Sequence, residues 1–257
     1  MAWEPFVKFV WSTATFIGMR RLCAWLPKSA YGDTVCYFSG ESAKGFVALT
    51  IDDGLCRNGA SRSMADEVVT LLRRHSAHAT FFVCTKYLEG CEVQAQTLVA
   101  NGHELGNHMG EDLNFVYPKM EPSQFDAALA DASASIERTA PGAKVRWFRA
   151  PQGVLTASMA EAVSRQGLKH ALGDCYSDDW ALEHNAKFVA RTLLKQATDG
   201  SILILHMPER GFREHTFKVL KLVLQGLEER NLKPVTLSEL HERCVRTAAQ
   251  DSTNSLI

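Results

Sequence analysis

The chain has 257 residues, of which 46% are hydrophobic and 22% are charged, a globular composition that excludes a wholly disordered protein. Its 28 Lys and Arg residues nearly balance its 29 Asp and Glu residues, which argues against a nucleic-acid-binding protein. The length fits one large domain, such as an α/β barrel, or two small domains.

The N-terminal segment raises the question of membrane contact. Residues 6–19 are mostly apolar, but the uncharged part, 9–19, is shorter than the roughly 20 residues that span a bilayer. Two interpretations stay open, a weak signal anchor and an amphipathic helix that caps the domain. Membrane contact is expected through this segment alone, and the sequence is compatible with a secreted, a membrane-anchored or a cytoplasmic protein.

Beyond a Gly- and Ser-rich linker at 31–44, apolar runs alternate with helical periodicity. In chain order the pattern predicts strand 46–51, helix 64–75, strand 80–83, helix 93–101, helix 123–139, strand 146–148, helix 156–166, strand 170–173, helix 186–197, strand 201–206, helix 215–230, strand 233–236 and helix 237–246. About seven such units predict an α/β fold with parallel strands, a distorted or incomplete (β/α) barrel. The expected parts are an N-terminal extension and linker (1–44), the barrel (45–246) and a flexible tail (247–257).

The seven cysteines are odd in number and scattered, with no C-x-x-C pair. This pattern argues against a zinc finger or a compact disulfide framework. It favours buried, reduced cysteines that pack as small hydrophobic residues, and leaves one or two disulfides open as the alternative.

Polar residues that directly follow apolar strands are the candidates for chemistry, because parallel α/β folds bind ligands at the carboxyl ends of their strands. Asp52 and Asp53 follow the first strand, and a bound cation or a shared proton would relieve their mutual repulsion. Asp-Gly is also an ordinary turn signal. His108 and Asp112 are four residues apart, so a helical turn would place both on one face as a metal-binding pair. A solvated loop is the alternative.

Three later strands end in residues that could complete such a site. Arg149 could hold a carboxylate in two-point geometry, and the turn at 151–153 presents backbone N–H groups to the same space. Asp179 and Trp180 follow the next strand, where a helix cap with a packed indole is the alternative. His206 ends the most apolar strand and would titrate near neutrality in a cleft. Their joint order predicts a metal site with a base, an orienting arginine and an acid.

Five motifs in order resemble those of the polysaccharide deacetylase (NodB-homology) family of carbohydrate esterases, and chitin deacetylases within it. They are Thr50-Ile51-Asp52-Asp53-Gly54, Asn107-His108 through Asp112, Arg149-Ala150-Pro151-Gln152-Gly153, Asp179-Trp180 and Leu205-His206. The resemblance runs from about Phe46 to Leu240, and it implies a distorted (β/α) barrel, in agreement with the alternation of strands and helices.

The resemblance implies a catalytic role for four of the matched residues. Asp52 would be the general base, and Arg149 would orient it. Asp179 would hold Arg149, and His206 would be the general acid.

The implied metal ligands are Asp53, His108 and Asp112. The family usually has a second histidine where this chain has Asp112, and a carboxylate makes the ligand set harder and more anionic. It should also make a bound water less acidic. The implied cofactor is a divalent metal ion, with zinc as the first candidate and cobalt, manganese or nickel as alternatives because of Asp112.

The implied substrate contacts are Gln152, Trp180 and Leu205. Gln152 stands where the family has an aromatic residue, and its backbone N–H would be the oxyanion donor. Met109 and Met207 are milder departures, at positions where the family favours Ser or Thr and a frequent Asp.

The function implied is metal-dependent removal of N-acetyl groups from an amino-sugar polymer or oligomer such as chitin, with release of acetate. The expected partner is therefore a carbohydrate and not a nucleic acid. Two alternatives stay open: hydrolysis of a small non-sugar amide on the same fold, and a catalytically silent carbohydrate-binding relative.

Overall fold

The computed structural model describes residues 33–113, 115–182 and 185–254. The N-terminal segment, with its signal-anchor and capping-helix interpretations, lies outside the described residues. The strands are β1 (Phe46–Gly54), β2 (Thr80–Val83), β3 (Glu104–Asn107), β4 (Trp147–Phe148), β5 (Lys169–His170), β6 (Ile202–His206) and β7 (Lys233–Val235). The α-helices are α3 (Ala65–Arg74), α4 (Glu92–Ala100), α5 (Pro122–Thr139), α6 (Ala157–Arg165), α7 (Ala186–Gln196), α8 (His215–Glu229) and α9 (Leu237–Asn254).

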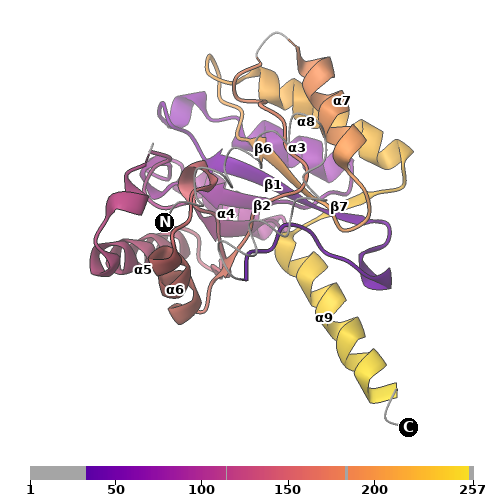
Figure 1. Cartoon of the computed structure of the whole chain (residues 1–257). Helices are drawn as coiled ribbons and strands as arrows, with labels where there is room; N and C mark the ends of the chain where they lie inside the picture. The colour runs from indigo at the N-terminus through magenta and orange to yellow at the C-terminus, as the bar shows by residue number, and fades with distance from the viewer. Residues whose placement is uncertain (1–32, 114, 183–184, 255–257) are drawn as a thin grey trace.

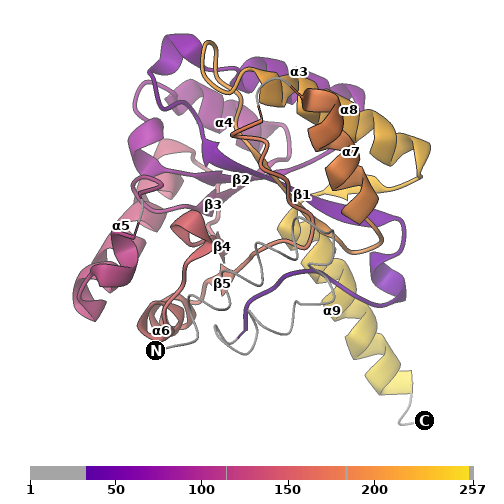
Figure 2. The ribbon, with the colours of Figure 1, turned by 45° about the horizontal axis from the view of Figure 1, so that its top comes forward.

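The strands form one curled, parallel sheet with helices around it (Figure 1). The strand order is β5-β4-β3-β2-β1-β6, and β7 pairs with the first residues of β1. Helices α3, α4, α7 and α8 gather beside the β1–β2 region, and α5 and α6 lie beside β3 to β5 (Figure 2). The α/β fold with a distorted, incompletely closed barrel of parallel strands is therefore confirmed.

Apolar sequence runs explain the centre of this sheet. All four residues of β2 are buried, as are Ile202 to Leu205 of β6, because both faces of these strands are covered. Helix α3 turns Val68, Leu71 and Leu72 inward, on the face that its periodicity predicted. Around the sheet, α7 packs on α8 and α5 on α6.

One strand, β3, was not predicted. Its sequence, Glu104 to Asn107, is neither apolar nor alternating, but it pairs with β2 on one side and β4 on the other. Gly106 suits this central position because a Cβ there would lie 2.8 Å from ring carbons of Phe82. The strand forms because β2 and β4 offer hydrogen-bond partners on both of its sides. This is a tertiary effect that the local sequence pattern does not show.

Other boundaries also differ from the sequence prediction. Residues 108–112 form an irregular loop, which was the alternative to a helical turn that the sequence left open. Helix α9 continues past the predicted end at Arg246 as far as Asn254 and extends away from the barrel (Figure 1). The described part of the predicted linker packs against the barrel, since Val35 and Tyr37 form bridges with Ala171 and Ser201.

Six of the seven cysteines lie in the part of the chain that the structure describes, and all six are free thiols; five of them are buried. This agrees with the reduced interpretation for those six. Among the described helices, none combines the length and the apolar character that crossing a membrane requires.

Candidate active site

The carboxyl ends of β1, β3, β4 and β6 bring the predicted site residues to one edge of the sheet. Asp52 and His206 are Cα partners on β1 and β6, so their side chains leave the sheet on the same face. His108 and Arg149 directly follow β3 and β4, which are neighbours in the sheet. The topology therefore collects residues that are up to 154 positions apart in the sequence, from Asp52 to His206.

A β-bulge allows Asp52 and Asp53 to serve the same site. In a regular strand, consecutive side chains point to opposite faces. Here the register with β2 shifts between Ile51 and Gly54, and Asp53 has a φ of 59°. This left-handed conformation, which Asp tolerates better than most residues, turns the Asp53 side chain toward the strand-end site.

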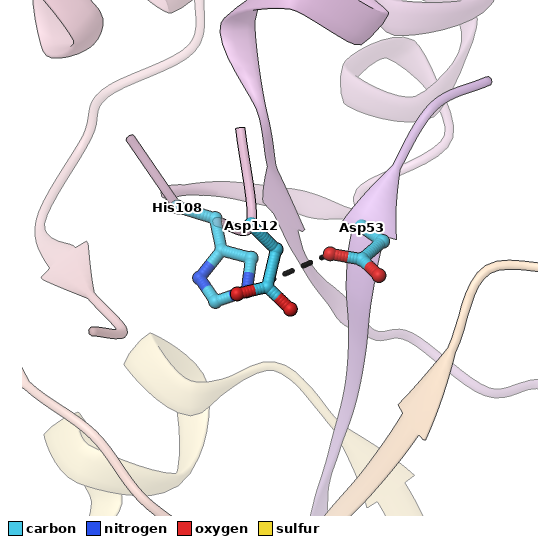
Figure 3. Close-up of side chains that lie close together, drawn as sticks. All are labelled: Asp53, His108 and Asp112. Carbon is cyan, nitrogen blue, oxygen red and sulfur yellow. Dashed lines mark ion pairs between the residues drawn. The ribbon is translucent and has the colours of Figure 1, made fainter. Parts of the chain in front are cut away.

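Asp53, His108 and Asp112 form a cluster that fits a divalent metal ion. One ligand atom from each residue lies within 4.8 Å of those of the other two, and the three side chains point toward one another (Figure 3). The His108 Nδ1–H donates to the carbonyl oxygen of Arg149 at 2.8 Å, which leaves Nε2 as the available ligand, 3.8 Å from Asp53 Oδ1. Such a bond fixes the tautomer and orientation that a metal-binding histidine needs.

Asp112 is held by Gln152 from the 3-10 turn η5 (Pro151–Gly153), which follows β4. The Gln152 backbone N–H donates to Asp112 Oδ1 at 3.0 Å, and its side-chain amide donates to Oδ2 at 2.7 Å. The backbone N–H that the resemblance assigned to an oxyanion therefore bonds Asp112 in this structure. Two of the residues in which the chain departs from the family pattern, Asp112 and Gln152, therefore contact each other.

Asp52 is paired with Arg149 through one guanidinium nitrogen, and not in the two-point geometry that the sequence suggested. The Arg149 Nη1 donates to Asp52 Oδ1 at 2.6 Å and to Thr50 Oγ1 at 2.8 Å, and Nε donates to the Ala171 carbonyl at 3.0 Å. The guanidinium also lies 4.2 Å from the centre of the Phe82 ring. Both charged groups are buried, which makes their mutual pairing necessary.

Asp179 contacts His206 and not Arg149, which corrects the predicted contact. His206 donates from Nδ1 to Asp179 Oδ1 at 2.7 Å, and its backbone N–H donates to Oδ2 at 2.8 Å. Burial lowers the pKa of His206, but Asp179, with Asp53 and Asp52, more than offsets it and raises the pKa from 6.5 to about 9. The imidazole is thus held in its protonated form at neutral pH, with Nε2 free of this pairing.

Two arginines that the sequence did not single out contact Asp53. The Arg213 Nη1 donates to Asp53 Oδ2 at 2.5 Å, and the Arg57 Nη2 lies 3.5 Å from the same oxygen. Burial raises the pKa of Asp53, but His206, His108 and Arg213 lower it to about 2. Arg57 was discoverable from its place just after the Asp-Asp-Gly turn, whereas the position of Arg213 in the loop after β6 carries no local signal.

The two remaining predicted substrate contacts lie in different surroundings. Trp180 is 45% exposed and donates through Nε1 to the Tyr176 hydroxyl at 2.9 Å, and the Tyr176 ring stands edge-on to His206 at 6.3 Å. Leu205 points to the strand face opposite His206 and is buried in the main hydrophobic core. Trp180 thus stands near the site, while the place of Leu205 favours packing over contact with a substrate.

The sequence of this chain is similar to those of known proteins. Residues 39–171 match the family model for polysaccharide deacetylase. The chitooligosaccharide deacetylase of Bradyrhizobium sp. (strain ANU 289) is 26% identical over 208 residues, which cover 76% of this chain and 90% of the relative. The peptidoglycan-N-acetylglucosamine deacetylase of Bacillus cereus (strain ATCC 14579) is 25% identical over 197 residues, covering 76% of this chain and 87% of the relative.

Solved structures share the fold. The peptidoglycan deacetylase PdaC from Bacillus subtilis superposes with a TM-score of 0.69 at 22% identity, over 84% of this chain and 99% of that one. A CE4 family pseudoenzyme from Bacillus anthracis gives a TM-score of 0.68 at 20% identity, over 80% of this chain and 68% of that one. The fold is therefore shared by deacetylases and by a relative described as a pseudoenzyme.

Proposed function

The chain belongs to the polysaccharide deacetylase family, and we propose that it is a metal-dependent hydrolase that removes N-acetyl groups from an amino-sugar oligomer or polymer. One observation carries the proposal. The Asp53, His108 and Asp112 cluster shares a single sheet edge with two ion pairs, Asp52–Arg149 and His206–Asp179. The names of the relatives, chitooligosaccharide and peptidoglycan N-acetylglucosamine deacetylases, support an N-acetylated carbohydrate as the substrate.

The donor set suits the cofactor that this function requires. Two carboxylates and one imidazole accept zinc, and the carboxylate majority also accommodates harder ions such as manganese. When bound at Asp53, His108 and Asp112, a divalent ion supplies Lewis acidity toward an acetyl carbonyl and lowers the pKa of a water molecule. Zinc is the first candidate, and cobalt, manganese and nickel are to be tested beside it.

Two residues of the chain, Asp52 and His206, each carry out one of the two proton transfers. Asp52 accepts the proton of the attacking water, and its bond to Arg149 fixes the orientation of the carboxylate. His206, protonated because of Asp179, donates a proton to the departing amine. One acid and one base, each with its own charged partner, suit amide hydrolysis, in which the nitrogen must leave as an amine.

A silent carbohydrate-binding relative is the second candidate, and a specific observation favours it. Asp112 stands where the family has a histidine, and it takes up the Gln152 N–H that the resemblance assigned to the oxyanion. That a neighbour in the fold comparison is a pseudoenzyme makes this candidate worth a direct test.

The test is acetate release from N-acetylglucosamine oligomers by the full chain. The protein is treated with a chelator, reloaded separately with zinc, cobalt, manganese or nickel, and compared with Asp52→Asn prepared in the same way. We expect metal-dependent acetate release that Asp52→Asn lacks although it binds the same amount of metal. Oligosaccharide binding without acetate release under every metal would reject the hydrolase and establish the silent relative.

A further inference from the structure

We propose that Arg57 is an anion-binding residue of this site and selects N-acetylated amino sugars that carry a carboxylate or a phosphate next to the acetamido group. The proposal rests on the proposed function, because it concerns the substrate of the same site. Arg57 lies in the loop after β1, and its guanidinium is the third at this edge of the sheet, after Arg149 and Arg213.

Arg57 is held in place before any ligand binds. The buried Glu209 accepts the backbone N–H groups of Arg57 and Asn58 at 2.9 and 2.8 Å, which fixes the loop. The guanidinium lies over two rings, 5.1 Å from the centre of Tyr87 and 5.7 Å from the centre of Phe212. A side chain fixed in this way loses little conformational entropy when it binds a ligand.

Most N–H donors of the Arg57 guanidinium make no hydrogen bond to any residue that the structure describes. A guanidinium carries five N–H donors, and its one hydrogen bond to a side chain is the 3.5 Å contact with Asp53 Oδ2. Charge-assisted bonds are normally about 2.7–2.9 Å long, and Arg149 and Arg213 reach their carboxylates at 2.6 and 2.5 Å. The Arg57 side chain is also 33% exposed, against 11% for Arg213.

Each acid of the site has a closer partner than Arg57. Asp52 is paired with Arg149, Asp53 with Arg213, and Asp112 with the two donors of Gln152. A fixed guanidinium with open donors matches the two-point geometry of a carboxylate or a phosphate. Because Arg57 reaches within 3.5 Å of a predicted metal ligand, the anion that it binds must lie on the sugar residue that carries the acetamido group, or directly beside it.

Binding measurements test the inference without turnover. The Asp52→Asn protein is titrated calorimetrically with N-acetylglucosamine, N-acetylglucosamine 1-phosphate and N-acetylmuramic acid, whose phosphate and carboxylate lie on the ring positions next to the acetamido group. These probes compare a neutral sugar with a phosphate and with a carboxylate. We expect at least one charged sugar to bind about 10-fold or more tightly than the neutral one, and which of the two does so identifies the anion.

The same titrations on two further variants locate the effect. Arg57→Gln should remove that 10-fold preference and leave the affinity for the neutral sugar within about twofold. The matched control is Arg165→Gln, because Arg165 is an exposed arginine on α6 that pairs with Asp126 outside the site. It should change neither affinity. Arg57→Lys, which keeps the charge on a flexible stem, should retain part of the preference and serves if Arg57→Gln does not fold.

Equal affinity for the neutral and both charged sugars, or a preference that survives Arg57→Gln, would overturn the inference and assign Arg57 to pinning Tyr87 and Phe212. Acetate release separates this outcome from failure of the proposed function. Equal release from neutral and charged sugars keeps the hydrolase and removes the role of Arg57. A preference in binding without release under any metal keeps the role of Arg57 and removes the hydrolase.

Discussion

Replacing Asp179 by asparagine is the sharpest test of the electrostatics of the site. The substitution keeps the shape of the side chain but removes the charge that His206 contacts at 2.7 Å. Asp179 is fully buried and the His206 side chain is 12% exposed, so solvent screens the pair little. We therefore expect the pKa of His206 in Asp179→Asn to fall from about 9 toward its ordinary value of 6.5.

The size of the effect follows from the shift. Each pKa unit corresponds to about 1.36 kcal/mol, so a rise from 6.5 to about 9 corresponds to about 3 kcal/mol of folding free energy. Since the folded pKa lies above the unfolded one, this stability is fully present below pH 6.5 and is lost as the pH rises through 9. Asp53 and Asp52 also raise the pKa of His206, so Asp179→Asn removes the largest share of the shift but not all of it.

The assay is urea unfolding of the metal-free protein at a series of pH values between about 6 and 10. The wild type should unfold with a higher free energy than Asp179→Asn at the acidic end of the series. This difference between the two proteins should shrink by about 2–3 kcal/mol toward the alkaline end. The control is Asp131→Asn, which neutralises an exposed aspartate on α5 and should show no such pH dependence. A difference between wild type and Asp179→Asn that is constant with pH would refute the pairing as the cause of the raised pKa.

Three further changes test other parts of the structure. Asp52→Asn should bind metal normally, because Asp52 is outside the ligand cluster, but should release acetate at least about 100-fold more slowly; normal turnover would refute its role as base. Gln152→Met removes the side-chain donor on Asp112 and should weaken metal binding about 10-fold, measured by equilibrium dialysis; an unchanged dissociation constant would show that the donor is dispensable. Gly173→Ala places a Cβ 2.6 Å from the Ile202 carbonyl oxygen and should cost about 1–3 kcal/mol in urea unfolding, whereas an unchanged midpoint would contradict the close approach.

The parts of the fold that local chemistry determines were predictable from the sequence. The apolar runs of β2 and β6 and the inner face of α3 are visible in composition and periodicity. Strand β3 is different, because its Glu104 lies against Thr80 and Ser238, residues far away in the sequence. Its strand conformation comes from pairing on both sides, which no local window reveals.

The site, like the fold, has a part that was predictable from the sequence and a part that was not. That polar residues after the strands meet was predictable, because parallel strands end at a common edge. Arg57 and Arg213, which also contact Asp53, were not predicted. The partner of each residue was not predictable, because it depends on side-chain directions. Asp179 lies within hydrogen-bond distance of His206 and was expected to bind Arg149, and the approach of Arg213 to Asp53 joins the loop after β6 to the end of β1.

The carboxylate at position 112 is expected to affect more than the preference for a metal. An extra acid among the ligands would repel Asp53, but each carboxylate has its own donors, Arg213 on Asp53 and Gln152 on Asp112, which stabilise the more anionic set. The same bond removes the Gln152 N–H from the place where an oxyanion would need it. The departures at 112 and 152 are therefore coupled, since Asp112→His alone would free the N–H and leave the Gln152 amide without its acceptor. Their effects on metal affinity should accordingly be non-additive, with Gln152→Met costly beside Asp112 and nearly neutral beside a histidine.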